Sequence, residues 1–326
     1  MANDNSGATQ ARDATEGTIT VTPELLRGWP LPEPDESGDK NARGRVLIVG
    51  GAPTMPGTVI LAGTAALRAG AGKVQIATCA SVAQSVAVAI PESYVVGLPE
   101  TKSGGIDPSA ARTIADLAQM ADAVLVGPGL SDRDAVQRLL KDLLPMLADT
   151  EAAVVLDAEA LMCVKEDATI LHRLVGRALL TPHAGELADM RGLDKSAVQD
   201  DPLAAARAAA AELRATVALK GAETYIVSPE PDAPAYHVHS NNVGLATSGS
   251  GDTLAGVVAG LAARGVEPAR AAAWGVYLRA IAGDRLAERI GRVGFLAREL
   301  LAEIPVVMHE IGNGESPVGN SNNPNA

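Results

Sequence analysis

Aromatic side chains are almost missing from this chain of 326 residues. Phenylalanine, tryptophan and tyrosine together make up 2% of it. Hydrophobic residues nevertheless reach 47%, so a buried core must be built from alanine, valine, leucine and isoleucine. This length and apolar content suffice for one large α/β domain of roughly 250–300 residues, or for two smaller ones.

Cysteine, positive charge and long apolar runs are also scarce. The two cysteines, Cys79 and Cys163, lack metal or redox spacing, which predicts buried thiols in a reducing compartment. The formal net charge of −12 disfavours nucleic acid and anionic membranes as partners. An anionic nucleotide would need a locally positive site. No secretory apolar stretch precedes residue 46 and no run reaches the ~18 residues of a membrane span, so we expect a cytoplasmic protein.

The two ends of the chain differ from its middle. Residues 1–19 and 312–326 are small and polar without periodicity, which predicts disordered tails. Thr22 followed by Pro23 is typical of a helix start. No repeat or linker interrupts residues 45–290, so we expect residues 20–311 to form a single domain.

Short apolar runs alternate with helical segments, among them residues 60–69, 81–89 and most of 256–290. This alternation is typical of a parallel sheet buried on both faces, and it predicts a three-layer α/β/α fold. Residues 224–227 and 236–239 predict an antiparallel hairpin towards the C-terminal end of the sheet. His237 and His239 share one face of that hairpin without an evident third metal ligand. The predicted parallel strands are residues 46–49, 73–78, 123–126, 153–156, 178–180 and 216–219.

Nearly every predicted strand ends in a residue suited to ligand binding. Glycine pairs or triplets follow the first and third of these strands, and Asp157, His183 and Lys220 follow later ones. Ligands of open α/β sheets bind beyond the carboxyl ends of the strands. We therefore expect these ends to converge on one site.

The most specific motif lies between Asn242 and Gly256. Gly249, Ser250 and Gly251 lead into an apolar stripe at helical spacing. A small-residue loop that begins a helix leaves backbone N–H groups free to bind phosphate oxygens. Asp252 stands at the mouth of this anion hole, where a carboxylate makes chemical sense if it deprotonates a hydroxyl that attacks the phosphate.

The other candidates each have two interpretations. The loop from Gly50 to Gly57 has neither the dinucleotide fingerprint nor a Walker A motif, which disfavours a dehydrogenase and favours a substrate turn. Asp157 could hold a magnesium-bound water or a structural hydrogen bond. His183 could bind substrate or cap a helix, and Glu186 could contact magnesium through water or favour a helix N-terminus. Lys220 ends a strand, which favours a role in binding over a solvated surface position.

Together these motifs resemble the ribokinase-like superfamily and, within it, the NAD(P)H-hydrate dehydratase family in its single-domain bacterial form. The resemblance covers about residues 20–310. Two departures stand out, because Thr58 replaces a small residue after Pro-Gly, and Ser240-Asn241-Asn242 replaces a common Thr-Gly-Asn. The segments that carry the resemblance are residues 45–51, 55–57, 68–73, 127–129, 157–158, 181–186, 220–224 and 242–256.

The resemblance implies a role for each matching residue. Substrate-binding positions are Thr58, Gly129, His183 and Asp252, and Asp252 is the catalytic base. Nucleotide-binding positions are Lys220, Gly221, Ala222, Glu223 and Thr224 on one loop, and Gly249, Ser250 and Gly251 on another. Glu186 is the candidate for contact with a metal ion through water.

The implied reaction is ADP-dependent dehydration of the S epimer of hydrated NADH or NADPH (NADHX, NADPHX), giving NADH or NADPH, AMP and phosphate. ADP is the co-substrate and Mg²⁺ the cofactor. We expect a homo-oligomer, for example a tetramer, that works with a separate epimerase. Two alternatives stay open: a small-molecule kinase acting on a hydroxymethylpyrimidine, thiazole or sugar, and a non-catalytic nucleotide-binding regulator, against which Asp252 argues.

Overall fold

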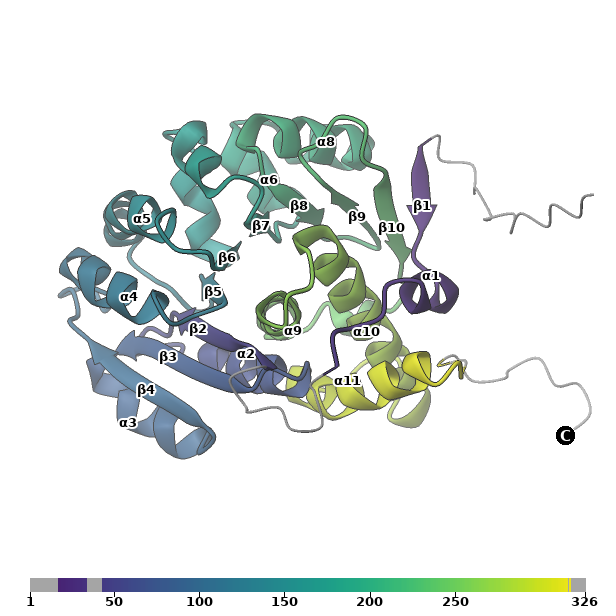
Figure 1. Cartoon of the computed structure of the whole chain (residues 1–326), viewed down its shortest axis with the longest axis horizontal. Coiled ribbons are helices and arrows are strands. Elements are labelled where there is room, and N and C mark those ends of the chain that lie inside the picture. The colour runs from purple at the N-terminus through teal and green to yellow at the C-terminus, as the bar shows by residue number, and fades with distance from the viewer. Residues whose placement is uncertain (1–16, 34–42, 316, 318–326) are drawn as a thin grey trace, which may run out of the picture.

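One mixed sheet with helices on both faces forms the structure, a computed structural model that describes residues 17–33, 43–315 and 317 (Figure 1). The strand order is β1-β10-β9-β8-β7-β6-β5-β2-β3-β4. The strands are β1 (Thr18–Thr20), β2 (Arg45–Val49), β3 (Lys73–Cys79), β4 (Ser93–Leu98), β5 (Ala123–Val126), β6 (Ala153–Leu156), β7 (Ala178–Leu180), β8 (Thr216–Leu219), β9 (Glu223–Val227) and β10 (Ala235–His239).

All neighbouring strands in this order pair in parallel except at β9, which is antiparallel to both β8 and β10. The predicted three-layer fold with a mostly parallel sheet and an antiparallel hairpin is therefore confirmed. The bounds of β5, β6, β7 and β8 coincide with the predicted ranges. Such strands are buried on both faces, so their apolar runs stop where the chain leaves the sheet.

The N-terminal boundary needs a correction. Thr18 and Ile19, expected in a disordered tail, belong to β1, which pairs in parallel with β10 and places Thr18 opposite Ala235. Of the predicted tails, residues 1–16, 316 and 318–326 lie outside the described part of the chain. At the C-terminal end the last helix continues to Gly312.

The helices divide between the two faces of the sheet (Figure 1). One face carries α1 (Pro23–Arg27), α2 (Gly57–Arg68), α3 (Ala80–Ala89), α9 (Ser250–Ala263), α10 (Pro268–Arg289) and α11 (Ala297–Gly312). The other carries α4 (Ala111–Ala118), α5 (Arg133–Leu147), α6 (Ala184–Arg191), α7 (Lys195–Asp200) and α8 (Pro202–Leu213). Short 3-10 helices lie at Pro108–Ala110, Ala158–Val164, Ala168–Leu174 and Val243–Leu245. Within the described residues, none of these helices combines the length and apolarity that crossing a bilayer requires.

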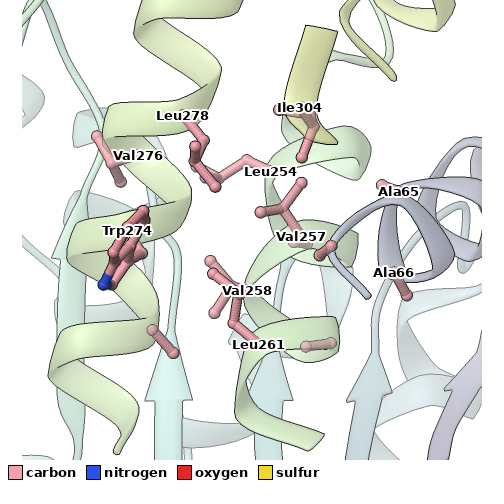
Figure 2. Packing of buried hydrophobic residues seen from close by; sticks show 14 of the residues in the cluster. Ala65, Ala66, Leu254, Val257, Val258, Leu261, Trp274, Val276, Leu278 and Ile304 are labelled. Carbon is pink, nitrogen blue, oxygen red and sulfur yellow. The ribbon is translucent and has the colours of Figure 1, made fainter. Parts of the chain in front are cut away.

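Helix α9 runs through the core and holds the predicted anion hole at its N-terminus. Its apolar stripe is fully buried between α10 and α2, as Figure 2 shows for Leu254, Val257, Val258 and Leu261. Glycine brings α9 against α2, because a Cβ on Gly256 would lie 2.2 Å from a backbone oxygen of α2. Small residues thus replace aromatic bulk in this core, and the close packing fixes the position of the anion hole.

Candidate active site

Two glycine turns meet where the strand order reverses, at the carboxyl ends of β2 and β5. Gly51 N donates to Pro128 O at 2.8 Å, which ties the turn after β2 to the turn after β5. Gly129 has φ +65°, and a Cβ there would lie 2.1 Å from Thr58 Oγ1. The two predicted substrate positions Gly129 and Thr58 are therefore in contact. A reversal of this kind is where open α/β sheets bind ligands.

An ion pair joins the ends of β6 and β8. Lys220 Nζ lies 2.9 Å from Asp157 Oδ1 and 3.7 Å from Glu186 Oε2. The hydroxyl of Thr181 donates to the same Asp157 oxygen at 2.6 Å. Asp157 was expected to hold either a magnesium-bound water or a structural hydrogen bond. It is only 3% exposed, and the structure shows the structural hydrogen bond. Burial opposes the charge on Lys220, but Asp157 and Glu186 outweigh that effect and raise its pKa.

His183 begins α6 and uses one ring nitrogen to do so. Its Nδ1 accepts a hydrogen bond from the backbone N–H of Glu186 at 3.0 Å. The backbone N–H of His183 in turn donates to Glu186 Oε2 at 2.7 Å, which completes a capping box. A neutral ring with Nδ1 as acceptor carries its proton on Nε2. Nε2 lies 3.6 Å from Glu186 Oε1, which is beyond hydrogen-bond distance, and the side chain is 58% exposed, so the Nε2–H donor is available to a ligand. The two interpretations of His183 are therefore compatible.

Asp252 lies in the first turn of α9 and is partly buried. Burial and the nearby charge of Asp157 raise its pKa from 3.8 to about 6, while Lys220 acts in the opposite direction. A carboxylate whose pKa approaches the working pH is both ionised and basic enough to take a proton. This is the electrostatic state that a catalytic base at a phosphate site requires.

Two clefts open on either side of the α9 N-terminus, and they share His183. The first, of about 550 Å³, is here called the Lys220 cleft, and the second, of about 510 Å³, the Asp252 cleft. The Lys220 cleft is lined by His183, Lys220, Gly221, Ala222, Ser240, Asn241, Asn242, Val243, Leu245, Ala246, Thr247, Ser250, Gly251 and Arg279. The Asp252 cleft is lined by Met55, Thr58, Gly129, Leu130, Arg133, Ala158, Glu159, Met162, His183, Gly185, Glu186, Asp189, Ser248 and Asp252.

The two clefts differ in charge. Lys220 and Arg279 line the first, which has no carboxylate among its lining residues. The second contains four carboxylates and one guanidinium, that of Arg133. In a chain of net charge −12, the Lys220 cleft is therefore the locally positive surface that an anionic nucleotide needs.

Most of the candidate residues line one of the two clefts, and their roles in binding stay predictions. Lys220, Gly221, Ala222, Ser250 and Gly251 line the first cleft, and Thr58, Gly129, His183 and Asp252 line the second.

Three nucleotide candidates line neither cleft. The carboxylate of Glu223 pairs with His237 and His239 across the β9–β10 hairpin. Thr224 is 2% exposed and its hydroxyl bonds to the peptide of Gly221, and Gly249 caps α9 in a left-handed conformation. Nucleotide contact by these three stays a prediction.

Arg279 and Arg133 are cleft residues that the sequence did not reveal. Arg279 lies in the middle of α10 and is 9% exposed, although an arginine in an alanine-rich helix usually faces solvent. Arg133 begins α5 and pairs with Glu159 at 2.5 Å. The only signal for Arg133 is its closeness in sequence to the glycine turn after β5.

Comparison with solved structures identifies the class of protein that this fold and site define. The chain superimposes on a ribokinase-like superfamily protein from Enterococcus faecalis with a TM-score of 0.77 at 25% identity, covering 91% of this chain and 97% of that one. The model of the NAD(P)H-hydrate dehydratase family matches residues 46–306. The chain therefore belongs to the NAD(P)H-hydrate dehydratase family.

Individual relatives agree with this placement. An ADP-dependent (S)-NAD(P)H-hydrate dehydratase of Xanthomonas campestris is 47% identical over 90% of this chain and 98% of its own length. The ADP/ATP-dependent NAD(P)H-hydrate dehydratase of Bacillus subtilis, co-crystallised with ATP and Mg²⁺, superimposes with a TM-score of 0.74 at 28% identity, covering 91% of this chain and all of that one. A bifunctional NAD(P)H-hydrate repair enzyme of Moorella thermoacetica is 40% identical, and the match spans 52% of its length.

Proposed function

We propose that this protein catalyses the ADP-dependent dehydration of (S)-NADHX and (S)-NADPHX back to NADH and NADPH, with release of AMP and phosphate. Family membership and the activities in the names of its relatives support the proposal. The observation that carries it is the placement of Asp252 in the first turn of α9, where it lines the Asp252 cleft and directly follows Gly251, which lines the cationic Lys220 cleft. A nucleotide and a hydroxylated substrate bound there would meet at this carboxylate.

The proposed chemistry follows from that placement. ADP binds in the Lys220 cleft with its terminal phosphate at the N–H groups of Gly249 and Gly251, which stabilise the charge of the transferring group. The N–H of Ser250, between them, donates to Thr247 O at 3.2 Å. Asp252 takes the proton from the hydroxyl on carbon 6 of the hydrated nicotinamide ring, and the oxygen attacks the β-phosphorus of ADP. The bond between that phosphorus and the bridging oxygen breaks, and AMP leaves with the electron pair. Phosphate then leaves carbon 6 with its bonding electron pair, assisted by the ring nitrogen, and loss of a ring proton restores the double bond.

Magnesium fits this site through phosphate and water. Among the described residues, no three His, Cys, Asp or Glu side chains are grouped so as to hold a metal ion. Mg²⁺ beside a nucleotide needs only one or two carboxylates, because phosphate oxygens and waters complete its coordination. Glu186, 3.7 Å from Lys220 and beside both clefts, would contact it through water, and the ion would supply further charge stabilisation to the phosphate.

The test is recovery of reduced nicotinamide from its hydrate. Purified protein is mixed with hydrated NADH and Mg²⁺, plus ADP or ATP, and absorbance at the reduced-nicotinamide wavelength is followed together with AMP release. We expect one AMP per NADH formed with ADP. If neither nucleotide restores absorbance, the proposal is wrong.

The same experiment separates the alternatives. A small-molecule kinase would share Asp252 and the anion hole but would release a stable phosphorylated product, detectable by mass spectrometry after incubation with a hydroxymethylpyrimidine, thiazole or sugar. A regulator would bind nucleotide without turnover. The match of the dehydratase family over residues 46–306 favours the dehydratase.

We also propose that the protein acts in the cytoplasm as a homo-oligomer, for example a tetramer, and that a separate epimerase supplies the S epimer. The bifunctional names of relatives such as that of Moorella thermoacetica support a link to a second repair activity. Light scattering measures the assembly. With a racemic hydrate, recovery of NADH beyond half of the total upon addition of an epimerase tests the coupling.

A further inference from the structure

Arg279 is a buried cation whose hydrogen bonds are incomplete. Its side chain projects from the middle of α10, is 9% exposed and lines the Lys220 cleft. Nη1 donates to Ser250 Oγ over a long 3.3 Å, and the buried Nε has no hydrogen-bond partner. Burial lowers the pKa of Arg279 to about 10.

The surrounding residues do not neutralise this charge. Asp157 is the carboxylate that acts on Arg279, but its Oδ1 already receives Lys220 Nζ and the hydroxyl of Thr181. The lining of the Lys220 cleft adds no other carboxylate. A buried guanidinium without full pairing costs stability, so an anion that reaches it would be strongly favoured.

A second feature lies beside Arg279 and also attracts anions. Ser250, to which Arg279 donates, is the first residue of α9, and its own N–H donates to Thr247 O at 3.2 Å. The helix dipole and the N–H groups of the following residues in the first turn favour negative charge there. Lys220 is close on the other side, because a Cβ on Gly251 would lie 3.8 Å from its Nζ. A guanidinium, an ammonium and a helix N-terminus therefore surround one part of the cleft.

We propose that Arg279 is a nucleotide-binding residue whose guanidinium pairs with a phosphate group of ADP held at the start of α9. The identity of the nucleotide rests on the function proposed above, whereas the anion requirement rests on the burial and pairing of Arg279 itself. In the bound state the phosphate thus compensates the charge of Arg279, which is incompletely paired in the free protein.

The test exploits this exchange between stability and binding. Arg279→Met removes the charge at similar volume, Arg279→Gln keeps polar donors, and Arg279→Lys keeps the charge. Arg270→Met is the matched control, because Arg270 lies on the same helix, is exposed and lines neither cleft. Calorimetry gives the ADP affinity without turnover, and thermal unfolding is measured with and without ADP or inorganic phosphate.

We expect Arg279→Met and Arg279→Gln to bind ADP about 10- to 100-fold more weakly, with Arg279→Lys in between and the control unchanged. The free Arg279→Met protein should unfold at a temperature equal to or higher than that of the wild type, by up to roughly 4 °C.

A loss of affinity below fivefold in Arg279→Met overturns the proposal, and so does a free Arg279→Met protein less stable than the wild type. The wild type could bind phosphate but not ADP, with phosphate raising the unfolding temperature of the wild type but not of Arg279→Met. That result would support the anion site at Arg279 and refute ADP as its ligand. If the wild type binds neither, the anion site falls as well.

Discussion

Replacing Asp252 by asparagine should make the protein more stable and nearly inactive at the same time. In the folded protein the pKa of Asp252 rises from 3.8 to about 6 because the group is buried and faces Asp157. A carboxyl group with a raised folded pKa binds its proton more tightly in the folded than in the unfolded state. Its ionised form therefore destabilises the fold above about pH 6, and the penalty disappears below about pH 4.

The size of the effect follows from that shift. A rise of about two pKa units corresponds to about 3 kcal/mol of unfolding free energy, which partial solvent exposure reduces to about 2 kcal/mol. We expect Asp252→Asn to unfold about 4 °C above the wild type at pH 8. The difference should shrink as the pH falls from 6 towards 4. Turnover should drop by roughly 10²-fold or more, because asparagine cannot accept the proton.

Urea unfolding at several pH values, together with the absorbance assay, checks both parts. Asp189→Asn is a control for which we expect the opposite change in unfolding free energy. A hydrogen bond from Lys165 lowers the pKa of Asp189, so its ionised form stabilises the fold at neutral pH. That variant should lose stability at pH 8 and regain parity in acid. A stability gain for Asp252→Asn that does not vary with pH would refute the electrostatic argument, and normal turnover would refute its role as base.

Three other changes test the site. Gly251→Ala should fold normally and raise the KM for ADP about tenfold, because the added methyl group meets only ordinary contacts but enters the phosphate site. Gly256→Ala should instead lose about 2 kcal/mol of unfolding free energy, because its methyl group collides with α2. Urea denaturation and steady-state kinetics distinguish the two variants. Lys220→Met should lower the free energy of unfolding by about 3 kcal/mol, because it leaves the buried Asp157 without its ammonium partner. The double variant with Asp157→Asn should regain part of this stability in urea titrations. Calorimetry should show that its ADP binding is not restored. Arg133→Gln should raise the KM for hydrated NADH about tenfold and leave the KM for ADP unchanged, because it removes the one guanidinium of the Asp252 cleft. A KM for hydrated NADH equal to that of the wild type in steady-state kinetics would contradict this.

The parallel part of the sheet was predictable because its strands carry their signal locally. Residues 123–126 and 153–156 are apolar throughout and are ended by glycine or aspartate, so their bounds agree with the structure. The edge strands gave no such signal. Strand β4 is half exposed, so its apolar pattern is weak, and β1 is three residues long and is held in place by pairing with β10, which is distant in sequence.

The position of a candidate residue was predictable where a local sequence signal marks it. His183 and Lys220 come shortly after strands, and Asp252 follows the glycine loop that begins α9, while the roles of all three stay predictions. The position was not predictable where it depends on packing. Arg279 is buried because α10 packs against α9 and against the sheet, whereas its sequence context resembles a solvated helix face. Likewise, the carboxylate of Glu223 faces His239 through the register of the hairpin, which the spacing alone does not fix.

The glycine contacts between α9 and α2 constrain how the enzyme moves. A methyl group on Gly260 would lie 2.7 Å from a backbone oxygen of α2, as one on Gly256 would lie 2.2 Å from another, so the two helices have no slack along their line of contact. We therefore expect α9 and α2 to keep their relative position when reactants bind. Amide hydrogen exchange should be slowest along α9, whether or not the nucleotide is present.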